Sequence, residues 1–395
     1  MKIFKRNYIV YFYAYFAAQV IFIYVNVYLP VYFFRVLDVN RTELAFVQIF
    51  AYSALLIKPV LSIYFDKVKS TRKMLIIISS FGVVVSYLFF IFNLNLLLVF
   101  GIFLGLNFVC ISVIDVAIDK TIVESSPDEK TKDRNASLTQ LGAIIGAIFP
   151  NLIAFLIFTD IYSISIWNQF FLIGTLAIFP LVIVGFILKV TTPELKETKE
   201  QSEEKIDSKS IILISIILFL FYAERIYEYP LEPWILEKFG EGNLSLFLLF
   251  LLIIVIINAL GVILAGLISN KFNRKNILTI SSLIYGILLI IAPFTDMITF
   301  FILFGIMQIF AGFMVINLIS LMIERSQNKV IYYQIMATFV FLATVIFIPL
   351  GTYLSGYIAT ELIIVIAGIL KILCIIPIYF LTINKKDMDY KKSDI

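Results

Sequence analysis

Apolar runs of about 20 residues recur along the whole 395-residue chain, and each is long enough to cross a bilayer as a helix. This repetition limits the possible folds more than any other feature. Hydrophobic residues make up 61% of the chain and charged residues 15%, whereas a soluble domain is about half apolar and about a quarter charged. We therefore expect an all-α polytopic membrane protein. The runs are too long for the alternating strands of a membrane barrel.

The apolar runs predict twelve membrane spans. They cover residues 7–34, 43–65, 74–93, 96–120, 135–158, 167–189, 210–231, 243–269, 276–294, 297–323, 331–358 and 361–383. Both chain ends then lie on one side of the membrane. Of the 31 lysines and arginines, 25 lie on that side, three on the opposite side and three within spans. Because cytoplasmic loops carry the excess of Lys and Arg, we expect both termini in the cytoplasm and a multi-pass protein of the cell membrane.

A long charged segment, "TTPELKETKEQSEEKIDSKS", follows the sixth span. Its composition is typical of a flexible connection. We therefore expect a cytoplasmic linker over 190–209 between two six-helix bundles, 1–189 and 210–383. A cytoplasmic tail over 384–395 would follow.

The two predicted bundles share a basic loop after their second span, "LSIYFDKVKSTRKML" in one and "AGLISNKFNRKNIL" in the other. The loops resemble the signature G-x-x-x-(D/N)-(R/K)-x-G-(R/K)-(R/K) of the major facilitator superfamily. The second copy matches it at Gly266, Asn270, Lys271, Arg274 and Lys275, with Asn273 in place of the usual glycine. The first copy has Ser62 in place of the leading glycine and a longer loop, and it keeps Asp66, Lys67, Arg72 and Lys73.

This resemblance implies twelve transmembrane helices in two pseudo-symmetric six-helix bundles, with a substrate site near the midplane between them. It also implies that the loop residues form a gate, in which a helix-end carboxylate such as Asp66 bonds the free N–H groups of a neighbouring helix. The alternative is that the basic residues only set the orientation. Within the superfamily, "KPVLSIYFD" and "DVAIDKTIVE" resemble the folate–biopterin, muropeptide permease and acetyl-CoA transporter branch.

Histidine is absent from the chain, and the two cysteines, Cys110 and Cys374, lie far apart in apolar runs. These counts predict no metal site, no disulfide and no cofactor. Any proton coupling must then use carboxylates. The net charge of +4 does not indicate a nucleic-acid partner.

The fourth span carries two acids, Asp115 and Asp119, on one helix face. Ionisable groups inside a membrane are costly and mark functional positions or internal ion pairs. Lys58 enters the second span from the same side. We therefore predict a cluster of Lys58 with Asp115 and Asp119, with one aspartate able to take up a proton. The alternative is a purely structural tie between the two helices.

The seventh span holds "YAERIYEYPLEPW", with Glu224, Arg225 and Glu228 in the outer half of the bilayer. Both glutamates are candidates for proton coupling, and we prefer Glu224 because the spacing lets Arg225 pair with Glu228 and hold it charged. The two prolines that follow are expected to end the helix. The alternative is an internal lock or a water-exposed helix end.

Five amides lie in spans that line the central cavity of the resembled fold, and we expect them to bind substrate or to bond between helices. They are Gln19, Asn26, Asn107, Gln308 and Asn317. Lys371 lies too deep in the last span to reach water, so we expect an intramolecular partner.

Together these features predict a monomeric secondary active transporter for a small organic solute that is neutral, zwitterionic or cationic. Its partners would be that solute, protons and the lipid bilayer. Two alternatives stay open: a proton-driven exporter of drugs or amphiphiles, and a non-transporting receptor, scaffold or scramblase on the same fold. No nucleophile–base pair or phosphate loop indicates an enzyme.

Overall fold

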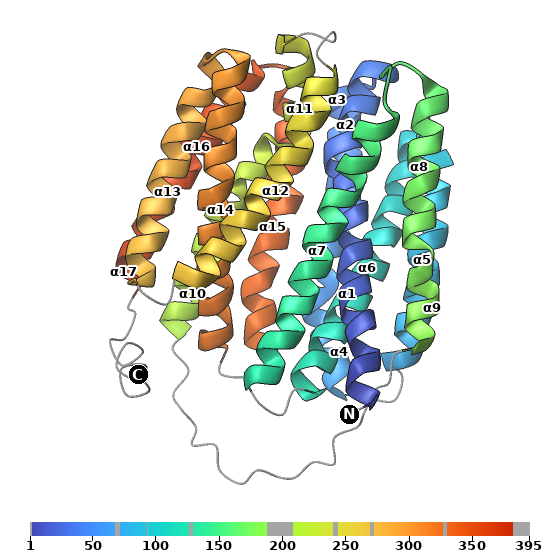
Figure 1. Cartoon of the computed structure of the whole chain (residues 1–395), viewed down its shortest axis with the longest axis vertical. Helices are drawn as coiled ribbons and strands as arrows, with labels where there is room; N and C mark the ends of the chain where they lie inside the picture. Colours follow the sequence, from blue (N-terminus) through green and yellow to red (C-terminus); the bar gives the residue numbers. More distant parts are fainter. Residues whose placement is uncertain are drawn as a thin grey trace.

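The computed structural model describes residues 2–67, 72–92, 94–125, 129–187, 208–239, 244–268, 272–326 and 330–381. All regular structure in these ranges is helical. Twelve helical segments are long and apolar enough to cross a membrane, and they run side by side along the long axis of the molecule (Figure 1). The predicted all-α membrane fold is confirmed. The predicted linker and tail lie outside the described residues, apart from the start of α10 at Ser208.

The first six spans are built from twelve elements, several of them segments of one continuous span. They are α1 (Lys2–Ile23), η1 (Tyr24–Tyr28), α2 (Leu29–Val31), η2 (Tyr32–Val36), α3 (Arg41–Ser53), η3 (Ala54–Ile57), α4 (Lys58–Lys67), α5 (Arg72–Phe92), α6 (Leu97–Ser125), α7 (Glu129–Ile157), α8 (Ile164–Ile178) and α9 (Pro180–Ile187).

 We call these elements the first group.

The other six spans form the second group. They are α10 (Ser208–Phe221), η4 (Tyr222–Ile226), α11 (Glu228–Phe239), α12 (Leu244–Ile268), α13 (Arg274–Ile291), η6 (Ala292–Phe294), α14 (Met297–Arg325), α15 (Val330–Leu354), α16 (Thr360–Leu373) and α17 (Ile375–Phe380).

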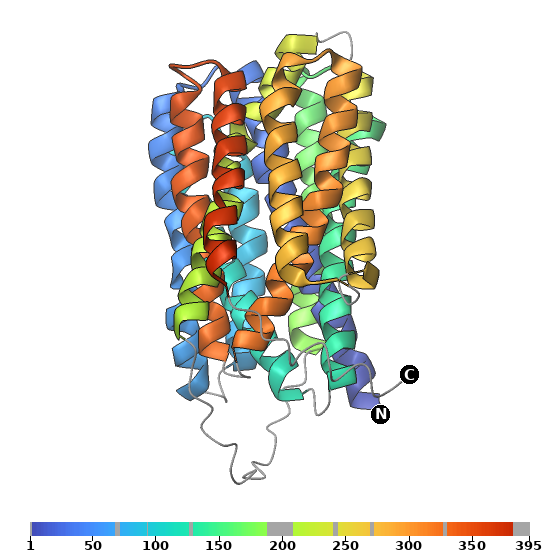
Figure 2. The same cartoon turned by 90° about the vertical axis from the view of Figure 1, so that its left-hand side faces the viewer.

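The two groups lie side by side (Figure 1), and the second group stands in front of the first when the molecule is turned by 90° (Figure 2). α3 and α4 pack against α15, α7 packs against α12, and α11 packs against η1 and α2. We call the end of the bundle where α1 begins the terminal face and the opposite end, where α3 begins, the far face. α11 lies toward the far face, so its contact with η1 and α2 joins the groups there (Figure 1).

Local breaks in the helices coincide with prolines. Pro30 has no N–H to donate, and the turn before it, η1, widens to a π-helix that contains Asn26. In the seventh span the helix does not end at Pro230 and Pro233, as the sequence had suggested. α11 continues through both prolines, and the chain instead tightens to a 3₁₀ helix at η4. Pro230 falls in the first turn of α11, where no donor is needed, so the helix does not end there. Pro233 lies inside the helix.

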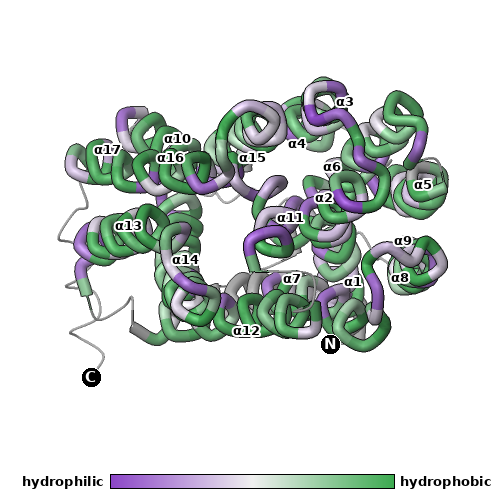
Figure 3. Tube along the Cα trace, turned by 90° about the horizontal axis from the view of Figure 1, so that it is seen from above, coloured by the Kyte–Doolittle hydropathy of each residue, from purple (hydrophilic) through white to green (hydrophobic). Residues whose placement is uncertain are grey.

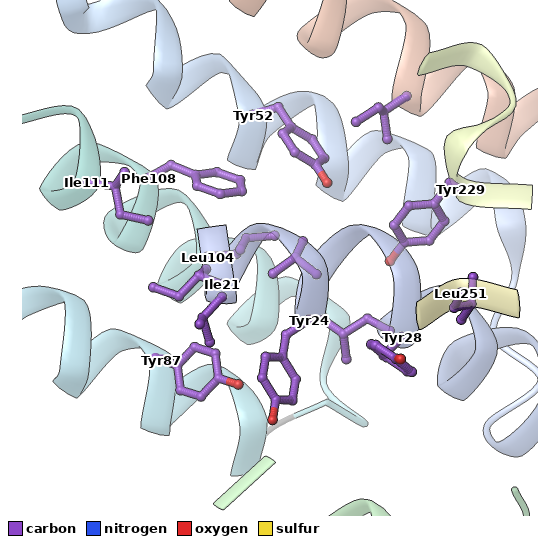
Figure 4. Packing of buried hydrophobic residues seen from close by; sticks show 14 of the residues in the cluster. Ile21, Tyr24, Tyr28, Tyr52, Tyr87, Leu104, Phe108, Ile111, Tyr229 and Leu251 are labelled. Atoms are coloured by element: carbon purple, nitrogen blue, oxygen red, sulfur yellow. The ribbon is translucent and has the colours of Figure 1, made fainter. Parts of the chain in front are cut away.

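Many large apolar side chains are exposed on the bundle, which suits a surface covered by lipid. Seen from above, the helices consist mostly of hydrophobic residues (Figure 3). Inside the first group the core is rich in aromatic rings (Figure 4). The Tyr24 hydroxyl donates to the Phe170 carbonyl at 2.9 Å, and the Tyr52 ring stacks on Phe108 at 5.1 Å. The buried Tyr24 hydroxyl thus has a partner, and the aromatic packing fixes the helices that carry the polar groups described next.

Candidate functional site

Lys58 and Asp115 form an ion pair between α4 and α6, as predicted. Lys58 is 4% exposed, and its ammonium group also lies 3.8 Å from the ring centre of Phe341 in α15. The cation therefore contacts a carboxylate of the first group and an aromatic face of the second. One buried lysine connects three helices across the boundary between the groups.

Asp119 is not part of that ion pair, although it lies one helical turn from Asp115. The Tyr15 hydroxyl of α1 donates to its Oδ1 at 2.5 Å, and the Gln334 amide of α15 donates to its Oδ2 at 3.3 Å. Both donors are neutral. Asp119 therefore links the two groups through hydrogen bonds without a direct salt bridge among the described residues.

Glu224 pairs with Lys371, whose partner could not be identified from the sequence. The distance from Lys371 Nζ to Glu224 Oε2 is 2.7 Å, and the lysine is fully buried. Its ammonium group also donates to the Phe221 carbonyl at 2.7 Å and lies 4.4 Å from the ring centre of Tyr285. The expectation that Glu224 is left without a cation is therefore wrong, because α16 brings Lys371 against η4.

Arg225 and Glu228 pair as predicted, with 3.9 Å between Nε and Oε2. Arg225 also donates to the Thr344 hydroxyl of α15. Glu228 interacts with the Asn26 amide of η1, and Asn26 accepts a hydrogen bond from Tyr52 at 2.5 Å. Polar side chains of α3, η1, η4, α11 and α15 thus lie close to one another at the boundary between the two groups.

A cavity of about 160 Å³ lies next to these two clusters. Its walls are mostly apolar and come from the seventh, tenth and eleventh spans, and they include three aromatic rings, Tyr222, Tyr333 and Phe341. Phe341 lies under Lys58, and the guanidinium of Arg225 lies 5.0 Å from the ring centre of Tyr222. The cavity is thus bordered by the Lys58 cluster on one side and by Arg225 on the other.

The far face is closed by contacts between the groups. Arg35 of η2 donates to the Pro233 carbonyl at 2.9 Å and lies 3.4 Å from Glu237. Arg41 of α3 donates to the Ser355 carbonyl, just beyond α15. These residues are two of the three basic residues assigned to the outer side by sequence, and their positions make them a lock between the groups.

The structure describes only some of the predicted gate residues. Asn270 and Lys271 lie outside the described residues, as do the side chains of Asp66 and Lys67. Arg72 is buried and donates to the Phe65 carbonyl at 3.1 Å, so it ties the start of α5 to α4, whereas Lys73 is exposed.

The second copy of the loop shows the same within-group ties. Arg274 pairs with Glu324 at 2.8 Å, and Lys275 donates to the Tyr379 carbonyl at 2.5 Å. Asn273 accepts from the Lys275 N–H at 2.9 Å and caps α13, which gives a reason for asparagine where the signature has glycine.

The five predicted amides have different surroundings, and Asn26 interacts with Glu228 of the opposite group. Asn107 is fully buried and bonds the Val83 carbonyl and Ser86 of α5, so it ties α6 to α5 and does not reach the cavity. Gln308 accepts from Asn258 of α12 at 3.0 Å. Asn317 bonds the carbonyl of Phe313 in its own helix, and Gln19 packs near Gly146 of α7.

One acidic residue was missed. Glu232 directly follows the predicted seventh span, 210–231, yet it lies inside α11 and is 5% exposed. Its spacing of four residues from Glu228 was the available signal, because it extends the acidic face of this helix by one turn.

A family model for the Major Facilitator Superfamily matches residues 112–331 and 214–394 of the chain. No curated protein matches the sequence.

Three solved transporter structures share the fold across nearly the whole chain. The nucleoside transporter NupG has a TM-score of 0.70 at 13% identity, with 98% of this chain and 100% of that chain covered. A partially occluded inward-open form of the xylose transporter XylE from E. coli has a TM-score of 0.75 at 12% identity, with 98% and 99% covered. The fucose:proton symporter FucP from E. coli has a TM-score of 0.62 at 14% identity, with 96% and 98% covered. At these identities the similarity concerns the fold alone.

Proposed function

Since the chain belongs to the major facilitator superfamily, we propose that it is a secondary active transporter that moves a small organic solute by alternating access. Protons drive the cycle through carboxylates of the site. The first and second groups act as the two bundles that rock against each other, joined by the linker over 190–209.

The observation that supports this proposal most strongly is the position of Asp119. It accepts hydrogen bonds from Tyr15 in the first group and from Gln334 in the second, and Gln334 directly follows Tyr333 of the cavity wall. A proton on this carboxyl group would occupy an oxygen that now accepts one of these bonds. Protonation therefore changes a contact that joins the two groups, which is what coupling to alternating access requires.

The charges around the cavity favour a neutral or cationic solute. The three deep cations, Lys58, Arg225 and Lys371, are each paired with an acid. A multiply anionic solute would need cations that are not already paired. The aromatic walls suit a ring, so a ring-bearing solute without excess negative charge fits best.

The charge pattern of the sequence supports a cytoplasmic position for both termini in the cell membrane. The terminal face is then the cytoplasmic face, and the far face, closed by Arg35 and Arg41, is the outer one. One chain supplies both groups, so a monomer suffices.

Reconstituted proteoliposomes test the proposal. Thermal shift first screens a panel of neutral and cationic ring-bearing solutes. Folates are included as multiply anionic comparison compounds. Uptake and internal pH are then followed under an imposed pH gradient. We expect gradient-driven flux of a panel member and loss of that flux, with counterflow exchange retained, in Asp119→Asn. Wild-type protein that binds a solute and never moves it under a gradient would favour a receptor or scramblase.

One observation keeps a second function in view. The cavity walls are mostly apolar, and such walls also suit amphiphiles that are exported. The direction of the proton gradient that drives accumulation in the same assay separates import from export.

A further inference from the structure

α11 carries an acid that the coupling scheme above does not use. Glu232 is 5% exposed, and its Oε2 has no hydrogen-bond partner among the described residues. It lies one helical turn beyond Glu228, at the far-face contact of α11 with η1 and α2. Buried polar atoms nearly always have a partner, so an orphaned carboxylate oxygen at a boundary between two groups calls for an explanation.

The neighbours of Glu232 supply no counter-charge in the described part of the chain. α11 packs against η1, α2, η4, α12, α15 and α16. Of these elements, η1, α2, α12 and α15 contain no charged residue.

The cations on the remaining neighbours are already bound. η4 carries Arg225, which pairs with Glu228, and α16 carries Lys371, which pairs with Glu224. Arg35, which reaches α11 from η2, binds the Pro233 carbonyl and Glu237. α16 also carries an acid, Glu361. The titratable groups that interact with Glu232 itself are Glu228, Tyr28, Tyr227 and Tyr229.

A buried carboxylate with no paired cation is strongly destabilising. Another acid and three phenols cannot compensate that charge. The closed far face can therefore hold Glu232 only if the carboxyl group binds a cation of its own. A bound proton removes the charge within the space of the side chain, whereas a metal ion needs several oxygen ligands around it.

We propose that Glu232 is a proton-binding site whose occupation is required for the far face to close. When α11 separates from η1 and α2, water reaches the carboxylate, which takes up one proton to become the carboxylic acid. Closure of α11 onto η1 and α2 then buries the neutral acid. The inference rests on the proposed alternating access and adds the residue that links the proton to the far face.

Distance measurements across the far face test this proposal. The Thr42 hydroxyl and the Tyr357 hydroxyl lie 3.5 Å apart across the boundary between the groups, so spin labels at Thr42→Cys and Tyr357→Cys report its opening. Cys110→Ala and Cys374→Ala remove the native thiols. With Glu232 present we expect short distances at acidic pH and a shift to long distances at alkaline pH. In the Glu232→Gln variant the distances between the labels should stay short at both acidic and alkaline pH. The control, Glu361→Gln on α16, should shift as the parent does.

The outcomes separate this inference from the proposed function. A full pH shift in Glu232→Gln overturns the role of Glu232 and leaves gradient-driven transport untouched. A parent that transports in proteoliposomes but shows no pH shift also overturns it. Closure at alkaline pH on replacing K⁺ by Na⁺ would assign the site to sodium instead of a proton.

Infrared difference spectra supply a readout that does not depend on motion. A protonated carboxyl group has a carbonyl band that a carboxylate and an amide lack. We expect Glu232→Gln to remove such a band from the purified protein at neutral pH and Glu361→Gln to leave it unchanged. An unchanged band in Glu232→Gln would show that the acid is not protonated there.

Discussion

Lys371 and Glu224 form an ion pair inside the second group, with 2.7 Å between Nζ and Oε2 and the lysine fully buried. The pair joins α16 to η4, the point at which the seventh span changes from an α-helix to a 3₁₀ helix. The ammonium group also binds the Phe221 carbonyl, at the end of α10. The lysine thus binds both a carboxylate within the 3₁₀ segment and the backbone carbonyl that directly precedes it.

Removing one member of this pair should be far more harmful than removing both. Lys371→Met leaves Glu224 buried without its cation, which should lower the free energy of unfolding by about 3–5 kcal/mol. Lys371→Met combined with Glu224→Gln removes both charges and should recover most of that loss. Thermal unfolding in detergent measures the coupling when Lys371→Met, Glu224→Gln and the double variant are compared. Equal losses in the single and double variants would contradict a direct pair.

The Lys58–Asp115 pair should respond differently, because it lies at the boundary between the groups. Lys58→Ala removes the cation that contacts both Asp115 and the Phe341 ring, so we expect a folded protein with strongly reduced transport. Asp115 is 24% exposed at its side chain, so water screens the remaining charge and the loss of stability should be smaller than at Lys371. Normal transport by a folded Lys58→Ala variant would show that the pair is not needed.

The pairing of the deep charges was only partly predictable from sequence. The i, i+3 spacing of Arg225 and Glu228 fixes their contact, because both lie on one helix. Lys58 and Asp115 enter their spans from the same side of the membrane, and this was enough to predict their contact. Lys371 and Glu224 lie on different helices 147 positions apart in the chain, and no local pattern encodes which helices become neighbours.

 The twelve spans, by contrast, follow from hydropathy alone, because every backbone polar group in a membrane must bond within its own helix.

The break in the seventh span shows a second limit. Pro230 and Pro233 mark an irregularity correctly, but a proline disturbs the turn that precedes it, so the 3₁₀ segment lies upstream at Tyr222–Ile226. Placing the helix end at the prolines also moved Glu232 out of the expected membrane interior. A single misplaced boundary therefore concealed a buried acid.

The Gln334–Asp119 hydrogen bond should stabilise the contact between α15 and α6. Gln334→Ala removes this donor while Tyr15 still binds the carboxylate. We expect a small loss of stability, about 1 kcal/mol, and a larger share of molecules open at the terminal face. Labelling of a cysteine at Ala337, which lines the cavity, should become faster in the variant. An unchanged labelling rate would show that the bond does not restrict access.

Acid should weaken the start of α14 through Asp296. This exposed residue caps the helix, accepting from the Thr299 hydroxyl at 2.6 Å and from the N–H groups of Ile298 and Thr299 at 3.1 Å. The hydrogen bond from the Thr299 side chain and those from the backbone lower the pKa of Asp296 below its ordinary value of 3.8. Its contribution to stability is therefore fully present above that value and is lost as the pH falls through the lower, folded-state pKa.

Hydrogen exchange of the first-turn amides of α14 measures this effect. The protection of these amides relative to their intrinsic exchange rate should fall in strong acid in the wild type. Asp296→Asn keeps a capping side chain without a titrating group, so its protection should not change over the same pH range. The same acid response in both proteins would assign the effect to another group.

The far-face lock should set the balance between the two open states. Arg35 and Arg41 bind carbonyl groups of the second group from η2 and α3, so each closes the far face through a charge-assisted hydrogen bond. Arg35→Gln with Arg41→Gln should lengthen the distance between labels at Thr42→Cys and Tyr357→Cys at every pH. Lys238→Gln is the matched control, because Lys238 binds the Pro293 carbonyl within the second group. If the double variant stays closed and Lys238→Gln opens, the closure depends on contacts inside the second group and not on the two arginines.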